Sequence, residues 1–144
     1  MHWPDRKLVL ALFAAGALSF LAGLAFVELI GRVPCRGETL VCRINEAIGA
    51  YAVVIWAILG PLIFGLVLAI ARNRAALLGA AIVLLVPPIA FFLLTQIEYT
   101  LRIGLEPERQ LRTFLVTFMP PALTVLVQYL ILCRVVKRAP ESSP

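Results

Sequence analysis

Four stretches of this chain contain no charged residue, and each is long enough to cross a lipid bilayer. They cover residues 8–27, 47–71, 75–97 and 113–133 and are 20 to 25 residues long. A transmembrane α-helix needs about 20 apolar residues to span a hydrocarbon core of roughly 30 Å. The mean hydropathy of the chain is +0.98, and 62% of its residues are hydrophobic, whereas about half are apolar in soluble domains. We therefore predict an all-α integral membrane protein.

The segments between these stretches predict a four-transmembrane-helix antiparallel bundle made of two helical hairpins. The connector Arg72-Asn73-Arg74 is so short that the second and third spans must be antiparallel neighbours. Asn45 is a predicted N-cap of the second span, and Glu106-Pro107-Glu108 predicts a helix start, since proline suits the first helical position. We predict a leader (1–7), a single membrane domain (8–138) and a disordered tail (139–144). Within the domain, the predicted spans lie at about 8–30, 47–71, 75–97 and 111–133, and the outer loops at 31–46 and 98–110.

The distribution of charge predicts the orientation of these spans. The leader, the middle connector and the tail together carry seven Lys and Arg residues, against six in the two longer loops. Six of the eight acidic residues lie on the side of the longer loops. Because cytoplasmic loops are enriched in Lys and Arg, we expect both termini in the cytoplasm. The basic residues are 11 Arg and 2 Lys in an Ala- and Leu-rich background, a composition typical of bacteria with GC-rich genomes, so we expect a bacterial inner-membrane location.

The cysteines agree with this orientation. Cys35 and Cys42 share the first outer loop, whereas Cys133 lies at the inner end of the fourth span. Disulfides persist outside the cytosol, so we predict a structural Cys35–Cys42 bridge, which would contribute about 2 to 3 kcal/mol. Thiol exchange and metal binding are the alternatives. The six-residue gap is not a C-x-x-C spacing, however, and the only histidine, His2, lies on the other side.

Prolines occur near the middle of three spans, which is the most unusual interior feature of the sequence. Proline has no N–H, so the carbonyl four residues before it loses its helical donor, and in lipid that carbonyl needs another partner. One interpretation is a set of bent helices around a cavity whose free carbonyls hold an ion or a hydrogen-bond donor. The other is kinked helix packing, which proline frequently accompanies in membranes. The predicted kinks are at Pro61, Pro87, Pro88, Pro120 and Pro121.

Polar side chains recur on one face of the fourth span and beside two span ends. Such a stripe predicts helix contact or, alternatively, a substrate-lining surface. Glutamate precedes arginine by four residues at the ends of the first and third spans, which predicts two interfacial ion pairs. The stripe comprises Thr113, Thr117, Thr124 and Gln128, and the pairs are Glu28 with Arg32 and Glu98 with Arg102. Of these, we select Glu28, Arg32, Glu98, Arg102, Thr117 and Gln128 as candidate polar contacts.

The reactive and ligand-binding residues in the sequence limit the classes of function that this chain can have. No histidine pair or C-x-x-C-H motif is present for haem, and no catalytic triad, metal cluster or phosphate-binding glycine loop is formed, so we expect no cofactor and no enzyme activity. Outer-leaflet catalysis by Glu and Arg is the least favoured hypothesis. The leading hypothesis is an accessory or assembly subunit of a larger membrane complex. The alternative is a homo-oligomeric transporter or channel for small solutes or ions. We expect the lipid bilayer as a partner and no nucleic acid.

Overall fold

Long helices make up almost the whole structure. The computed structural model describes residues 6–33, 39–104 and 107–138, and no strand occurs among them. Four segments are long and apolar enough to span a membrane: Arg6–Gly31, Arg43–Ile70, Arg74–Arg102 and Gln110–Val136. The predicted all-helical class is confirmed, and these segments support a multi-pass membrane protein. The elements are α1 (Arg6–Gly31), α2 (Thr39–Ile70), α3 (Arg74–Ile103), α4 (Pro107–Thr113), the π-helical turn η1 (Phe114–Phe118) and α5 (Met119–Arg138).

The helices extend beyond the predicted spans. Helix α2 begins at Thr39, so the prediction that Asn45 caps its N-terminus is wrong, and Asn45 lies inside the helix. The residue that does cap a helix is Asn73, whose side chain accepts a 2.7 Å hydrogen bond from the Ala76 N–H at the start of α3. Helix α4 begins at Pro107, as predicted. Polar residues that sequence analysis assigned to loops therefore lie on helices, where they face neighbouring elements.

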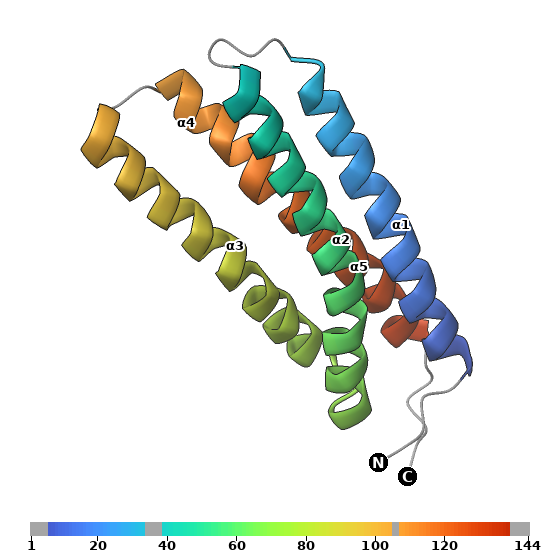
Figure 1. Ribbon diagram of the computed structural model, residues 1–144. Coiled ribbons are helices and arrows are strands. Elements are labelled where there is room, and N and C mark those ends of the chain that lie inside the picture. Colours follow the sequence, from blue (N-terminus) through green and yellow to red (C-terminus); the bar gives the residue numbers. More distant parts are fainter. Residues whose placement is uncertain (1–5, 34–38, 105–106, 139–144) are drawn as a thin grey trace.

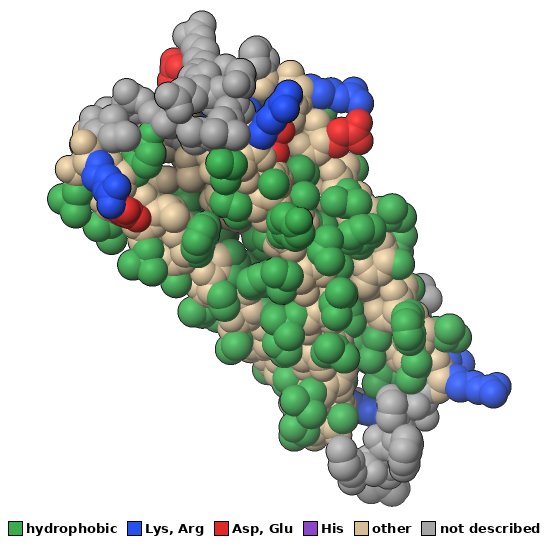
Figure 2. All heavy atoms as spheres, in the orientation of Figure 1, with side chains coloured by type: hydrophobic (Ala, Val, Ile, Leu, Met, Phe, Trp, Pro, Cys, Tyr) green, Lys and Arg blue, Asp and Glu red, His purple; other side chains and the backbone are tan. Residues whose placement is uncertain are grey.

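Helix α5 is the centre of the bundle. It contacts α1, α2 and α3, and its segment is the most buried of the four. Figure 1 shows the start of α1, the α2–α3 connection and the end of α5 at one end of the bundle, and the α3–α4 connection at the other. Hydrophobic side chains cover the flank between them, with charged side chains gathered towards the ends (Figure 2). A flank of this kind suits contact with lipid.

The half of the bundle towards the α2–α3 connection has a closely packed apolar core. Its largest members are almost wholly shielded from the surface, with relative exposures of 0 to 1%. They come from α2, α3 and α5 and belong to one hydrophobic cluster. They are Phe64, Leu68, Leu77, Val125 and Leu132.

Carbonyls that lose their donor to proline are covered by neighbouring helices. Pro88 removes the donor for the Leu84 carbonyl, and the Trp56 indole N–H donates to that oxygen over 2.8 Å. Trp56 lies on α2 and Leu84 on α3, so this bond joins two spans. The structure therefore supplies one of the predicted replacement donors from the chain itself.

Glycines cover two further carbonyls of this kind. The Ala57 carbonyl, whose donor Pro61 removes, faces Gly16 of α1, where an added Cβ would lie 3.1 Å from the oxygen. The Val116 carbonyl, whose donor Pro120 removes, faces Gly49 of α2, where an added Cβ would lie 2.5 Å away. A Cβ at Gly49 would collide with the oxygen, and a Cβ at Gly16 would make a contact tighter than most, so glycine favours both approaches. Both approaches suit weak Cα–H to oxygen contacts.

The backbone before Pro120 and Pro121 departs from the α-helical repeat. Within η1, the Met119 N–H donates to the carbonyl of Phe114, five residues earlier. Single π-helical turns of this type are commonly found inside α-helices at functional positions.

The bond between Trp56 and Leu84 predicts energetic coupling between Trp56 and Pro88. Trp56→Phe should lower the free energy of unfolding by about 0.6 kcal/mol, a typical value for a hydrogen bond in a membrane. In a Pro88→Ala background the new Ala N–H can donate to Leu84, so the same change should cost less. Titration with sodium dodecyl sulfate, followed by circular dichroism, measures both costs.

The matched control for this cycle is Pro87→Ala. Pro87 removes the helical donor for the carbonyl of Val83, and the residue Val83 is 63% exposed. Equal coupling of Trp56 to both prolines, or to neither, would contradict the assignment.

Candidate functional site

A hydrogen-bond network crosses the middle of the bundle. Gln128 is fully buried, and its Nε2 donates to Ser19 Oγ over 2.9 Å and to the Trp56 carbonyl over 3.1 Å. Ser19 Oγ donates in turn to the Gly16 carbonyl over 2.9 Å. With the bond from Trp56 to Leu84, the network includes residues of α1, α2, α3 and α5. Gln128 thus uses its donors inside its own chain.

Gly60 makes room for this network. The Gln128 carboxamide oxygen is buried, accepts no conventional hydrogen bond, and lies against Gly60. A Cβ at Gly60 would collide with the carboxamide. Gly23 leaves similar space for Thr124, whose hydroxyl donates to the Pro120 carbonyl over 2.9 Å. This half of the predicted polar stripe is therefore closely packed.

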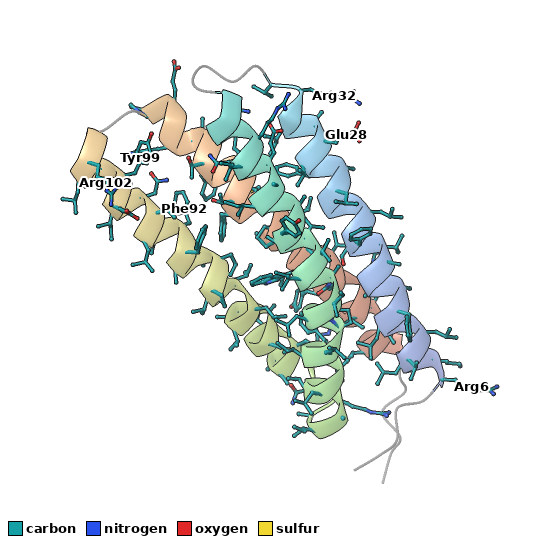
Figure 3. All side chains as sticks on the ribbon, viewed as in Figure 1. Arg6, Glu28, Arg32, Phe92, Tyr99 and Arg102 are labelled. Atoms are coloured by element: carbon teal, nitrogen blue, oxygen red, sulfur yellow. The ribbon has the colours of Figure 1, made fainter. Side chains whose placement is uncertain are left out.

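A second polar region forms a pocket towards the α3–α4 end of the bundle. Its volume is about 370 Å³, within the range of small-molecule sites. Figure 3 shows Tyr99 and Arg102 near the end of α3, and both residues line this pocket. We call this cavity the interfacial pocket. It is lined by Asn45 and Ile48 of α2, by Phe91, Thr95, Gln96, Glu98, Tyr99 and Arg102 of α3, and by Gln110, Thr113 and Thr117.

Threonine hydroxyls in the interfacial pocket already donate to the backbone. Thr95 donates to the Phe92 carbonyl over 2.8 Å, and Thr117 donates to the Thr113 carbonyl over 2.7 Å. The Gln96 carboxamide oxygen is buried and has no hydrogen-bond partner. The pocket therefore offers oxygen acceptors at Thr95, Gln96 and Thr117, beside the hydroxyl of Tyr99 and the guanidinium of Arg102, which can donate.

Ion pairs lie around the ends of the helices. The two predicted pairs form, with 2.9 Å between Arg32 and Glu28 and 2.8 Å between Arg102 and Glu98. All four side chains are largely exposed, so each pair is worth about 0.5 kcal/mol or less. A third pair, Arg112 with Glu46 at 3.3 Å, links α4 to α2 and is more buried. Its two members are 66 residues apart in the sequence, so no local spacing could predict this pair.

The structure brings together some of the predicted site residues. Glu98, Arg102 and Thr117 all line the interfacial pocket. Glu28 and Arg32 lie at the end of α1 (Figure 3), and Gln128 belongs to the network in the middle of the bundle. Cys35 and the side chain of Cys42 lie outside the described residues, so the disulfide stays a prediction. Cys133 is partly buried and carries no disulfide.

Sequence analysis selected Arg102 but missed Thr95 and Tyr99, which also line the pocket. These three residues are spaced by four and three, which places them on one face of α3. That spacing is the signal that could have identified Thr95 and Tyr99. Gln96 lies beside this face, and Asn45 was assigned to a helix cap instead. The facing wall includes Thr113 and Thr117, which the stripe on the fourth span did identify.

Phe64, Leu68 and Leu77 are buried between the network and the α2–α3 end. Among the described residues, no group of three His, Cys, Asp or Glu side chains could hold a metal ion. No family model, curated protein or solved structure matches this chain.

The contact between Gln128 and Gly60 predicts that substitution of Gly60 by alanine costs more stability than the same substitution at Gly79. Gly60→Ala should lower the free energy of unfolding by about 1 to 3 kcal/mol, because the new methyl group overpacks a closed site. The matched control is Gly79→Ala on α3, where an added Cβ meets nothing within 4 Å. This control should not destabilise the protein. Detergent titration of both purified variants tests the asymmetry, and equal costs would refute the role given to Gly60.

Proposed function

We propose that this protein is an accessory or assembly subunit of a larger bacterial inner-membrane complex and binds its partner through the lipid-facing surface of α3. In this proposal the chain crosses the membrane as two antiparallel hairpins, with both termini in the cytoplasm. The four apolar helices support the membrane location. The charge distribution supports the orientation.

The observation that carries the proposal is the open position of Gly79. Gly79 and Ala75 are both exposed and lie four residues apart, on the same face of α3. An added Cβ at Gly79 meets nothing within 4 Å, so no packing inside the chain accounts for this glycine. Pairs of small residues at this spacing let the backbones of two membrane helices approach closely. A partner helix would fill the space that the chain leaves empty.

The interior polar groups support an external partner surface indirectly. Gln128, Ser19 and Thr124 form hydrogen bonds within the chain, so these side chains are not available to another protein. On the surface of α3, Gly79 keeps an open position that no neighbour inside the chain fills. The homo-oligomeric transporter stays the alternative, and its path would have to lie between copies of the chain.

Gly79→Leu tests the partner surface. The larger side chain should prevent close helix approach and reduce recovery of the larger complex at least fivefold, while the isolated protein stays folded. The measurement is native extraction in a mild detergent, followed by size analysis and identification of stoichiometric partners. The matched control is Ala17→Leu on the exposed side of α1, which should leave the complex intact.

Two results would contradict the proposal. The first is an unchanged complex with Gly79→Leu. The second is a complex containing only copies of this chain together with solute flux in vesicles reconstituted from it alone, which would establish the transporter alternative.

Labelling of single cysteines tests the orientation. In a background with Cys35, Cys42 and Cys133 changed to serine, Glu108→Cys should react with a membrane-impermeant maleimide added to spheroplasts. Arg72→Cys should react only after the membrane is opened. Both positions are exposed at opposite ends of the bundle. The reverse pattern would place the termini outside and remove the compartment argument for the Cys35–Cys42 disulfide.

A further inference from the structure

The interfacial pocket lies at the depth where a lipid headgroup meets its acyl chains. Ion-paired Glu98 and Arg102 are among its lining residues, and charged side chains of this kind occupy the membrane–water interface. Phe91 also lines the pocket, is 47% exposed and lies about two turns before Glu98 along α3. An apolar chain can therefore follow the surface of α3 at Phe91 while a polar group enters the pocket.

The polar wall favours a ligand that donates hydrogen bonds. The Gln96 carboxamide oxygen is buried without a partner, which is costly unless something donates to it. Thr95 and Thr117 have used their hydroxyl protons on backbone carbonyls, so their oxygens remain as acceptors. Three acceptors from α3 and η1 thus line one cavity.

The charges at the interfacial pocket favour a neutral ligand. Its two charged lining residues with described ion pairs, Glu98 and Arg102, neutralise each other at 2.8 Å. Asn45 and Gln110 add uncharged carboxamides. A phosphodiester has no proton to donate to the buried Gln96 oxygen, and an ammonium group would compete with Arg102 for Glu98. A hydroxyl group both donates to an acceptor and carries no charge.

We propose that the interfacial pocket binds a neutral, hydroxyl-rich group, as in the sugar headgroup of a glycolipid or a free saccharide. Gln96 Oε1, Thr95 Oγ1 and Thr117 Oγ1 accept from its hydroxyls. Ile48 and Phe91 contact its apolar part. The volume of about 370 Å³ accommodates one sugar ring. This proposal does not depend on the partner surface at Gly79, which lies near the other end of α3.

The test uses the full chain in nanodiscs made from equal amounts of phosphatidylcholine and monoglucosyl diacylglycerol with the same acyl chains. Native mass spectrometry counts the lipids that stay bound to the protein. The wild type should retain the glucosyl lipid in preference to phosphatidylcholine. Gln96→Leu and Thr95→Val should each reduce this preference about fivefold to tenfold, the effect of losing one hydrogen bond.

Glu28→Gln is the matched control. It removes one charge from an exposed, ion-paired glutamate of α1 that does not line the pocket, so the preference should change less than twofold. Circular dichroism and detergent titration establish that each variant is folded, and Thr95→Val keeps the side-chain volume in case Gln96→Leu perturbs packing.

Free glucose in excess distinguishes the two sources of the hydroxyl group. Displacement of the glucosyl lipid shows that a saccharide from solution shares the pocket, and persistence of the lipid shows that the acyl chains contribute to recognition. Either result supports the proposal. Equal retention of both lipids, a preference unaffected by Gln96→Leu and Thr95→Val, or a preference abolished by Glu28→Gln would overturn it.

Discussion

The carboxamide of Gln128 holds the four spans in one arrangement. Lipid tails are as apolar as leucine side chains, so helices in a bilayer associate through close packing and hydrogen bonds and not through the hydrophobic effect. Gln128 donates to Ser19 of α1 and to the Trp56 backbone of α2. Trp56 then donates to Leu84 of α3. The position of each helix thus depends on polar atoms that have few other partners at this depth.

Prolines and glycines act together in this bundle. Pro61, Pro88 and Pro120 each expose a carbonyl, and a neighbouring helix covers it with either a donor or a backbone that lacks a Cβ. Trp56 covers Leu84, Gly16 covers Ala57, and Gly49 covers Val116. Each of these contacts joins two different helices. The hydrogen bond that proline removes within one helix is therefore replaced by a contact with another helix. Proline at mid-membrane depth is therefore compatible with a closed interior in this chain.

The sequence predicted the helical class, the start of α4 and two ion pairs, because each depends on local pattern. Charge-free runs reveal spans, Pro107 reveals a helix start, and a spacing of four reveals the pairs of Glu28 and Glu98. The interfacial pocket depends on how three helices meet near the η1 turn, and no single-helix pattern contains that information. Asn45 illustrates the limit, because its identity suits a cap but α2 begins six residues earlier, at Thr39.

The central position of α5 has a consequence for biosynthesis. Chains are made from the N-terminus, so α1, α2 and α3 enter the membrane before α5 exists. Until then Ser19 lacks the Gln128 amide, and α3 packs mainly against α2 among the helices already made. The first three spans therefore enter the bilayer before the contacts that α5 makes with each of them can form. Insertion of the last span is the step that converts them into a folded protein, and premature termination before α5 would leave a polar serine of α1 without its partner in lipid.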